Sequence, residues 1–249
     1  MHPDWIVPDW PAPANVHAFM TTRAGGVSQP PYDSMNPASH VGDRPEAVAE
    51  NRRILRADLP AEPLWLNQVH GSCVAERAES AEPPCADAGI ARQAGEVRAV
   101  LTADCLPVLL CDRAGTVVAA AHAGWRGLAG GVLEETIGAM RVPPGELLAW
   151  LGAAIGPDEF EVGDEVRLAF MDRHPLAAVA FRPALPGTLD EAPRKWLADI
   201  YALARIRLAA AGVEAVYGGG LCTVRDGRRF FSYRRDGTTG RMASLIWLE

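Results

Sequence analysis

The chain has 249 residues, of which 49% are hydrophobic and 22% charged, and its formal net charge is -7. This composition excludes a disordered or fibrous protein, because nearly half of the chain is available for a buried core. The negative charge makes the surface as a whole unfavourable for nucleic acid and for anionic membranes, so a phosphate site must be a local basic cluster. We therefore expect no nucleic-acid partner and no membrane association.

The N-terminal segment does not resemble a signal peptide, because it carries two aspartates and four prolines instead of a cationic stretch followed by an apolar run. No stretch reaches the roughly 18 apolar residues that a membrane-spanning helix needs. The five cysteines form no close pair, which favours reduced thiols over a disulfide framework. These features predict a cytoplasmic protein.

Apolar residues at helical spacing and capping residues predict four helices. Asp43 with Glu46 three residues later fits a capping box for the first helix. Gly212 follows the fourth helix as an expected stop. The predicted helices cover residues 43–55, 130–140, 164–171 and 195–211.

Short apolar runs separated by polar or turn residues predict strands. Asp226-Gly227 and Asp236-Gly237 are typical of hairpin turns. The segment 79–96 is predicted to be a surface excursion, and the segment 182–193 is predicted to be a loop. Because strands and helices mix without strict alternation, an α+β fold in a single domain, residues 1–249, is expected. The predicted strands cover residues 97–102, 106–111, 116–121 and 243–248.

One predicted hairpin places a cysteine opposite a histidine. If Asp112 to Gly115 form the loop, Cys105 lies directly opposite His122 in the antiparallel ladder. Opposed residues share a face with Cβ atoms about 4.5–5.5 Å apart, which lets a thiolate and an imidazole bind one metal ion. Pro107 cannot donate to the ladder, and a bulge there would shift this register.

His70 is the candidate third ligand, because it follows the polar pair Asn67-Gln68 and precedes Gly71 at the expected start of a turn. Two histidines and one cysteine leave a fourth coordination position open, as in catalytic zinc sites. Copper would also bind this donor set. Two other interpretations stay open: Cys105 as a nucleophile with His122 as its base, and histidines that only satisfy hydrogen bonds in the core.

Six motifs in order resemble the YfiH-type laccase-domain family, also described as multicopper polyphenol oxidases, purine nucleoside phosphorylases and peptidoglycan editing factors. The resemblance extends from about Val16 to Leu248. Ala153, where close relatives are expected to have proline, and residues 85–92 depart from the family pattern. The motifs are TTRAGGVS (21–28), NQVHG (67–71), TADCLPVLL (102–110), HAGWRGL (122–128), AIGPDEFEVG (154–163) and FFSYRRDGTTGRMASLIWL (230–248).

The resemblance implies a four-layer α/β/β/α sandwich of mixed sheets and a zinc ion on His70, Cys105 and His122. It also implies phosphorolysis of adenosine, inosine and methylthioadenosine, with adenosine deaminase side activity. The expected partners are a small-molecule nucleoside and inorganic phosphate, in a monomer or homodimer. A hydrolase that edits peptidoglycan precursors and a copper-dependent polyphenol oxidase remain alternatives, although the latter chemistry needs several coppers.

Arginines are the natural candidates for binding phosphate, because the guanidinium group binds oxyanions through two parallel hydrogen bonds. Arg126 lies between two glycines just after His122, and Arg23 and Arg241 lie in other motifs. Asn36 and Arg52 are candidates for contacts to ribose or base. These five residues form the predicted substrate-binding set, although packing or solvent exposure would explain each of them as well.

Four further residues near the motifs are candidates for supporting roles. Asp104 and Asp87 could position a metal ligand, or Asp104 could simply pair with a cation. Trp125 and Phe231 could stack on a purine, although aromatic residues are more often part of the core.

Overall fold

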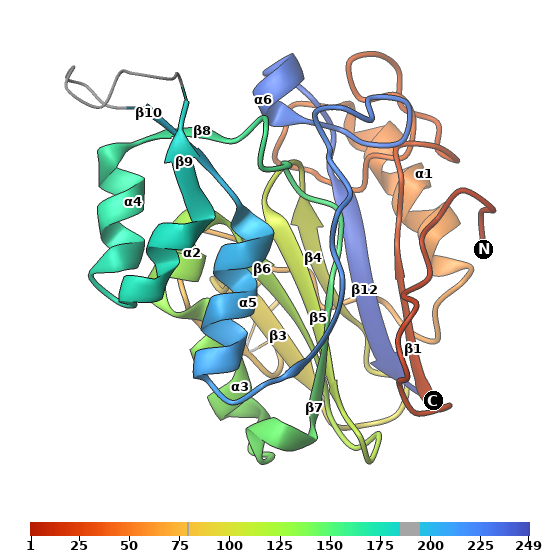
Figure 1. Cartoon of the computed structure of the whole chain (residues 1–249). Helices are drawn as coiled ribbons and strands as arrows, with labels where there is room; N and C mark the ends of the chain where they lie inside the picture. The colour runs from red at the N-terminus through yellow and green to blue at the C-terminus, as the bar shows by residue number, and fades with distance from the viewer. Residues whose placement is uncertain (79, 185–194) are drawn as a thin grey trace.

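The computed structural model describes residues 1–78, 80–184 and 195–249. Its elements form four layers: a group of helices, a six-stranded sheet, a three-stranded sheet and one further helix (Figure 1). The expected α+β fold with α/β/β/α layering is confirmed. Within the described residues, no helix combines the length and the apolar character that crossing a membrane requires.

The central six-stranded sheet has the order β11-β7-β5-β6-β3-β2. Its middle strands are antiparallel, whereas β2 pairs with β3 and β11 pairs with β7 in parallel. Every residue of β5 and β6 is buried, because other layers cover both faces of the sheet. The strands are β2 (Val74–Ala75), β3 (Ala88–Ala91), β5 (Leu106–Asp112), β6 (Val118–Ala123), β7 (Leu147–Leu151) and β11 (Ala215–Gly218).

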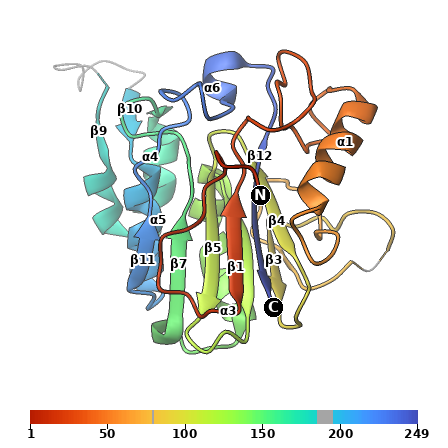
Figure 2. The same cartoon turned by 90° about the vertical axis from the view of Figure 1, so that its right-hand side faces the viewer.

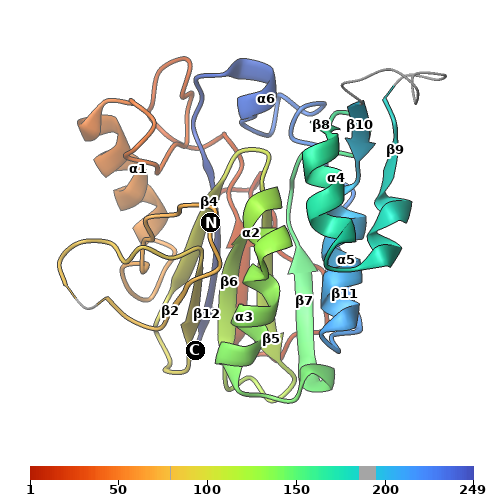
Figure 3. The same cartoon turned by 90° about the vertical axis from the view of Figure 1, so that its left-hand side faces the viewer.

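Helices cover one face of this sheet, with α2 and α3 running along it (Figure 3). Leu128, Leu133 and Leu203 from these helices pack against the strands in one continuous core. A small three-stranded sheet lies at the edge of this layer, in the order β8-β10-β9. The elements are α2 (Trp125–Gly130), α3 (Val132–Met140), η1 (Pro144–Glu146), β8 (Glu161–Gly163), α4 (Asp164–Met171), η2 (Pro175–Ala180), β9 (Phe181–Pro183), β10 (Lys195–Ala198) and α5 (Ile200–Ala210).

The other face is covered by the sheet β1-β12-β4, which consists of β1 (Val16–Met20), β12 (Met242–Leu248) and β4 (Arg98–Thr102). Successive side chains of β12 alternate between its two faces. Ile246 packs toward the central sheet, whereas Leu245 packs with Leu55 of α1 (Pro45–Arg56) on the outer face. The α1 helix is therefore the fourth layer (Figure 2).

The two large sheets end together beneath α6 (Tyr233–Asp236), at the top of Figures 1 and 2. At this end β4 stops at Thr102 and β5 begins at Leu106, so the three residues between them cross from one sheet to the other. His122 lies near the end of β6 and therefore at the same end of the central sheet. This shared end brings the predicted site residues together.

Three of the predicted helices begin at other residues than expected. Residues 195–198 form β10, and α5 begins only after Asp199, whose carboxylate accepts hydrogen bonds from the amides of Tyr201 and Ala202. In the helix expected at 130–140, Gly131 adopts a φ of 105° and separates α2 from α3. The first helix starts at Pro45 without a capping box, because the Asp43 carboxylate accepts hydrogen bonds from Ser28 and Asn36.

The two expected hairpins near the C-terminus are also absent from the described residues. Asp226 lies in a turn, where its carbonyl oxygen accepts a hydrogen bond from the amide of Phe230. Asp236 is the last residue of α6. The segment 79–96 is only partly a surface excursion, because β3 within it is fully buried. Of the loop expected at 182–193, Arg182 and Pro183 belong to β9, and residues 185–193 lie outside the described part of the chain.

Candidate metal centre and active site

The observed hairpin differs from the predicted register by two residues. Pro107, not Cys105, lies opposite His122. The reason is Asp112, which stays in the strand while its carboxylate accepts hydrogen bonds from the amide and hydroxyl of Thr116 at 2.7 and 2.6 Å. A shift of two residues preserves the face of every side chain. Cys105, just before β5, therefore still lies on the face of His122.

His70, Cys105 and His122 converge at the shared end of the sheets, and we call them the metal trio. One ligand atom from each lies within 4.8 Å of the others, and in the described part of the chain no other three His, Cys, Asp or Glu residues converge in this way. The Cys105 thiol is 3.8 Å from Nε2 of His70. The two imidazole rings are 4.7 Å apart and inclined by 73°. Two nitrogens and one sulfur thus form a group that could hold a metal ion.

Asp87 positions both histidines of the metal trio. It directly precedes β3 and lies opposite His122, whose Nδ1 is 2.8 Å from Oδ1 of the carboxylate. The same carboxylate accepts from the amides of His70 at 2.9 Å and Gly71 at 2.7 Å, and from the amide of Val69 at 3.2 Å. Because Nδ1 of His122 bonds to Asp87, its Nε2 is the nitrogen available to a metal.

The ionisation of the site follows from these contacts. Burial alone would raise the pKa of the Asp87 carboxyl, but hydrogen bonds from His122 and Gly71 outweigh burial and lower it. Burial likewise opposes ionisation of the Cys105 thiol, yet the charge and hydrogen bonds of His122 and His70 lower its pKa to about 6. The pKa of His122 rises to about 9 against burial, through Cys105 and Asp87. Without metal, the cysteine and the histidine therefore form a thiolate–imidazolium pair at neutral pH.

Two residues of the site are held in the left-handed backbone region, His70 with a φ of 61° and Asp104 with a φ of 85°. A non-glycine residue in this region costs about 1–2 kcal/mol, which neighbouring contacts must offset. For Asp104, the hydroxyl of Thr223 and the amide of Arg234 donate to its carboxylate at 2.5 and 2.6 Å. Asp104 thereby ties the loop that carries Cys105 to the segment around α6.

Gly124 leaves the space that the metal trio needs. A Cβ at this position would lie 2.9 Å from the Cys105 sulfur, 3.0 Å from Cδ2 of His70 and 3.4 Å from Nε2 of His122. Its φ of -60° and ψ of 154° suit any residue, so only the space is restrictive. We therefore expect Gly124→Ala to push the ligands apart and to weaken zinc binding roughly tenfold in a competition titration with a chromogenic chelator.

Gly138→Ala is the matched control for this substitution. Gly138 lies in α3, and a Cβ there would meet no described atom within 4 Å. Alanine should stabilise the helix by about 0.5–1 kcal/mol and leave zinc affinity unchanged. Equal zinc affinity in both variants would show that Gly124 does not shape the site.

Two hollows adjoin the metal trio. Both are bordered by Ala103 and Tyr233, and in both His70 and Cys105 form part of the wall. The first, which we call the Arg241 hollow, has a volume of about 310 Å³ and also contains His122 in its wall. The second, the Trp125 hollow, has a volume of about 250 Å³.

The two hollows differ in their chemistry. The Arg241 hollow is lined also by His40, Gln68, Leu101 and Thr102, and burial together with the charges of Arg241 and Arg52 lowers the pKa of His40. The Trp125 hollow is mostly apolar, with charged groups at Asp104 and at two arginines. Its further lining residues are Trp125, Arg126, Ile155, Phe160, Ile200 and Arg234.

The structure brings only some of the predicted substrate-binding residues to these hollows. Arg241 lines the first hollow, and Arg126 lines the second, where it stacks on Trp125. Arg23, Asn36 and Arg52 line neither. Arg23 donates to Asp33 and Gly227, Arg52 donates to the Pro37 carbonyl and stacks on Trp65, and Asn36 accepts from the amide of Arg241.

Four residues that line the Arg241 hollow were not singled out from the sequence: His40, Gln68, Thr102 and Tyr233. Gln68 and Thr102 belong to motifs that also contain metal ligands, and Tyr233 follows Phe231 in the last motif. Nothing in the spacing of these residues shows that they face the same space. Of the other candidates, Trp125 lines the second hollow and Phe231 is buried in the core.

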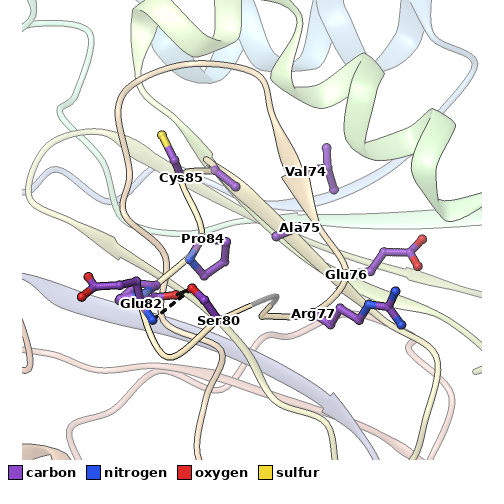
Figure 4. A pocket seen from close by; sticks show the side chains of 10 residues that line it. Val74, Ala75, Glu76, Arg77, Ser80, Glu82, Pro84 and Cys85 are labelled. Atoms are coloured by element: carbon purple, nitrogen blue, oxygen red, sulfur yellow. Dashed lines mark hydrogen bonds between the residues drawn. The ribbon is translucent and has the colours of Figure 1, made fainter.

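A further hollow lies elsewhere, inside the loop between β2 and β3, and has a volume of about 730 Å³. Figure 4 shows the side chains of Glu76, Arg77, Ser80 and Glu82 around it. Its charged residues are exposed, and none of the metal trio lines it. This hollow is therefore separate from the candidate metal centre.

The layered fold and the convergent His–Cys–His group define an α+β protein with one candidate metal centre at the joint end of two sheets. The family model described as multi-copper polyphenol oxidoreductase laccase matches residues 17–249. The chain therefore belongs to this laccase-like family.

Relatives in this family carry another description. A protein named purine nucleoside phosphorylase from Pseudomonas aeruginosa is 57% identical over 98% of both chains. The purine nucleoside phosphorylase YfiH of Escherichia coli is 56% identical, also over 98% of both chains. Among solved structures, a Neisseria meningitidis protein superposes with a TM-score of 0.92, at 56% identity over 99% of each chain. YlmD of Geobacillus stearothermophilus superposes with a TM-score of 0.88 at 30% identity, and the match covers 98% of this chain and 96% of YlmD.

Proposed function

We propose that this protein is a zinc-dependent purine nucleoside phosphorylase that acts on adenosine, inosine and methylthioadenosine and also deaminates adenosine. One observation carries the proposal: His70 and Cys105 of the metal trio line two hollows, in a chain 57% identical to a protein named purine nucleoside phosphorylase. The protein acts in the cytoplasm, where its free cysteines stay reduced.

The donor set supports zinc. A structural zinc site has four protein ligands, whereas the metal trio offers two nitrogens and one sulfur and leaves a position for a substrate or water. When bound, zinc supplies a Lewis acid at that position. The described residues hold one such group, which argues against an oxidation that needs several coppers, although copper can bind the same donors.

The residues around the metal trio orient the ligands and bind the two substrates. Asp87 orients His122 and the loop of His70, so that the ligands are held in place before substrate binds. Arg241 supplies a cation for phosphate, and Trp125 supplies a flat apolar surface for a purine ring. The two hollows thus offer sites for two substrates beside one centre.

Metal analysis and a nucleoside assay on the purified protein test the proposal. We expect about one zinc per chain, and release of hypoxanthine from inosine only when phosphate is present. Adenosine should yield adenine with phosphate and inosine without it, which separates phosphorolysis from deamination. Full activity in protein stripped of metal, or base release that does not depend on phosphate, would overturn the proposal.

A cysteine hydrolase acting on a cell-wall precursor is the second candidate, because the thiolate–imidazolium pair of Cys105 and His122 is also the arrangement of a cysteine nucleophile and its base. In that case substrate should protect Cys105 from alkylation, and chelators should leave turnover unchanged. Loss of turnover on chelation, restored by added zinc, favours the phosphorylase.

A further inference from the structure

Thr102 has a buried hydroxyl that the protein itself does not satisfy. The residue ends β4, is 1% exposed and lines the Arg241 hollow. Its Oγ1 has no hydrogen-bond partner among the described residues. A buried hydroxyl without a partner costs free energy, and at Thr102 it belongs to a residue that lines the hollow, where a bound group would satisfy it.

Arg241 is fixed in place but keeps hydrogen-bond donors free. Its Nη1 donates to the carbonyl oxygens of Thr239 and Gly240, both at 3.0 Å, and its amide donates to Asn36. Within the part of the chain that the structure describes, Nε and Nη2 make no hydrogen bond and the guanidinium pairs with no carboxylate. Arg241 directly precedes Met242, which lies opposite Thr102, so both groups reach the hollow from neighbouring strands.

The charge of the hollow suits an anion. Among the residues that line it, none carries a carboxylate, although the chain carries a net charge of -7, and the Cys105 thiolate is the ligand whose charge a bound zinc ion would neutralise. The Trp125 hollow is less suitable, because Asp104 forms part of its wall. Of its two arginines, Arg234 donates to the carbonyl oxygen of Glu161 and Arg126 lies on the ring of Trp125.

We infer that the Arg241 hollow is the phosphate site, where the Arg241 guanidinium and the Thr102 hydroxyl hold the anion, and that the Trp125 hollow holds the nucleoside. This inference rests on the proposed function. Because both hollows border on Cys105 and His70, phosphate and nucleoside would lie next to each other at the centre. A phosphate oxygen then forms a bond to C1′ of the ribose, while the bond from C1′ to the purine nitrogen breaks and its electron pair leaves with the purine, which takes up a proton.

Steady-state kinetics of Thr102→Val and Arg241→Gln in the zinc-loaded enzyme test the inference. Valine keeps the shape of threonine and removes only the hydroxyl. We expect the KM for phosphate to rise about tenfold in Thr102→Val and about a hundredfold in Arg241→Gln, with the KM for inosine changed less than about twofold. Trp125→Ala should have the opposite effect: it should raise the KM for inosine and leave the KM for phosphate unchanged.

Ser244→Ala is the matched control, because Ser244 is fully buried, its hydroxyl has no partner among the described residues, and it lines neither hollow. Inorganic phosphate alone should raise the melting temperature of the wild type and of Ser244→Ala, but not of Thr102→Val or Arg241→Gln.

The outcomes separate this inference from the proposed function. An unchanged KM for phosphate in both variants of the hollow, in an enzyme that does phosphorolyse inosine, overturns the inference and leaves the function intact. An enzyme that binds phosphate through Thr102 and Arg241 but cleaves no nucleoside overturns the function and leaves the anion site intact. If Thr102→Val does not fold, Arg241→Gln decides the same question.

Discussion

Replacing Cys105 by serine is expected to lower base release from inosine roughly a thousandfold and to reduce the zinc content far below one ion per chain. The Cys105 thiol has a pKa lowered to about 6 by its histidine neighbours, so it is a thiolate at neutral pH even before metal binds. A serine hydroxyl does not ionise under these conditions, and a site with two imidazoles alone binds zinc weakly. Atomic absorption and the phosphate-dependent assay on the same preparation measure both effects.

Cys85→Ser is the control for Cys105→Ser, because Cys85 is exposed, carries a free thiol and lines the separate hollow of the β2–β3 loop. It should retain zinc and activity. Two results would contradict the zinc assignment in different ways. A Cys105→Ser protein that keeps its zinc but loses turnover indicates a cysteine nucleophile, and one that keeps full turnover removes Cys105 from the chemistry altogether.

The convergence of Cys105 and His122 could be predicted from the sequence because an error of two residues in a β-strand register does not change the face on which a side chain lies. The predicted hairpin register was wrong by two residues, since Asp112 keeps its place in the strand and moves the turn toward Thr116. Residues two apart on a strand share a face, so Cys105 and His122 still converge. An error of one residue would have placed them on opposite faces of the sheet.

The role of Asp87 was harder to predict because the strand that follows it has no usual strand signature. β3 consists of alanine, glycine and one isoleucine, and every residue in it is buried between other layers. Small residues in such a strand resemble a loop in sequence, and the segment was accordingly expected at the surface. Without β3 there is no ladder to β6, and therefore no reason to place Asp87 opposite His122.

The proposed phosphate site could not be predicted from sequence patterns, for a different reason. Thr102 and Arg241 are more than a hundred residues apart and meet only because β4 and β12 pair. Both have donors that stay unpaired among the described residues and both line the hollow beside the metal trio, whereas Arg23 donates to Asp33 and Gly227. Such a difference depends on the complete set of tertiary contacts.

Asp87→Asn should weaken zinc binding by about 10–100-fold and destabilise the protein by about 3 kcal/mol at neutral pH. The carboxylate accepts from four N–H groups, and an asparagine must turn its NH₂ toward one pair of them. If the NH₂ faces the backbone amides of Val69 and Gly71, the loop that carries His70 must move. If it faces His122, the imidazole must accept at Nδ1 and carry its proton on Nε2, where it can no longer bind metal.

The pH dependence of stability separates the charge of Asp87 from its shape. Because the folded protein lowers the pKa of this carboxyl, its contribution is complete above the unfolded value of about 3.9 and is lost as the pH falls through the folded value. The melting temperatures of wild type and Asp87→Asn should therefore differ most near neutral pH, begin to converge at about pH 4, and converge fully only below the lowered pKa of the folded state.

Asp112→Asn provides the comparison that assigns the zinc effect to position rather than to lost stability. Asp112 is also buried, its carboxylate also accepts from N–H groups, and hydrogen bonds from Thr116 and Val117 likewise lower its pKa against the effect of burial. It lies at the opposite end of β5 from the metal trio. Asp112→Asn should thus lose comparable stability with the same pH dependence and keep its zinc affinity. Equal zinc loss in both variants would mean that general destabilisation, and not the orientation of His122, controls the metal centre.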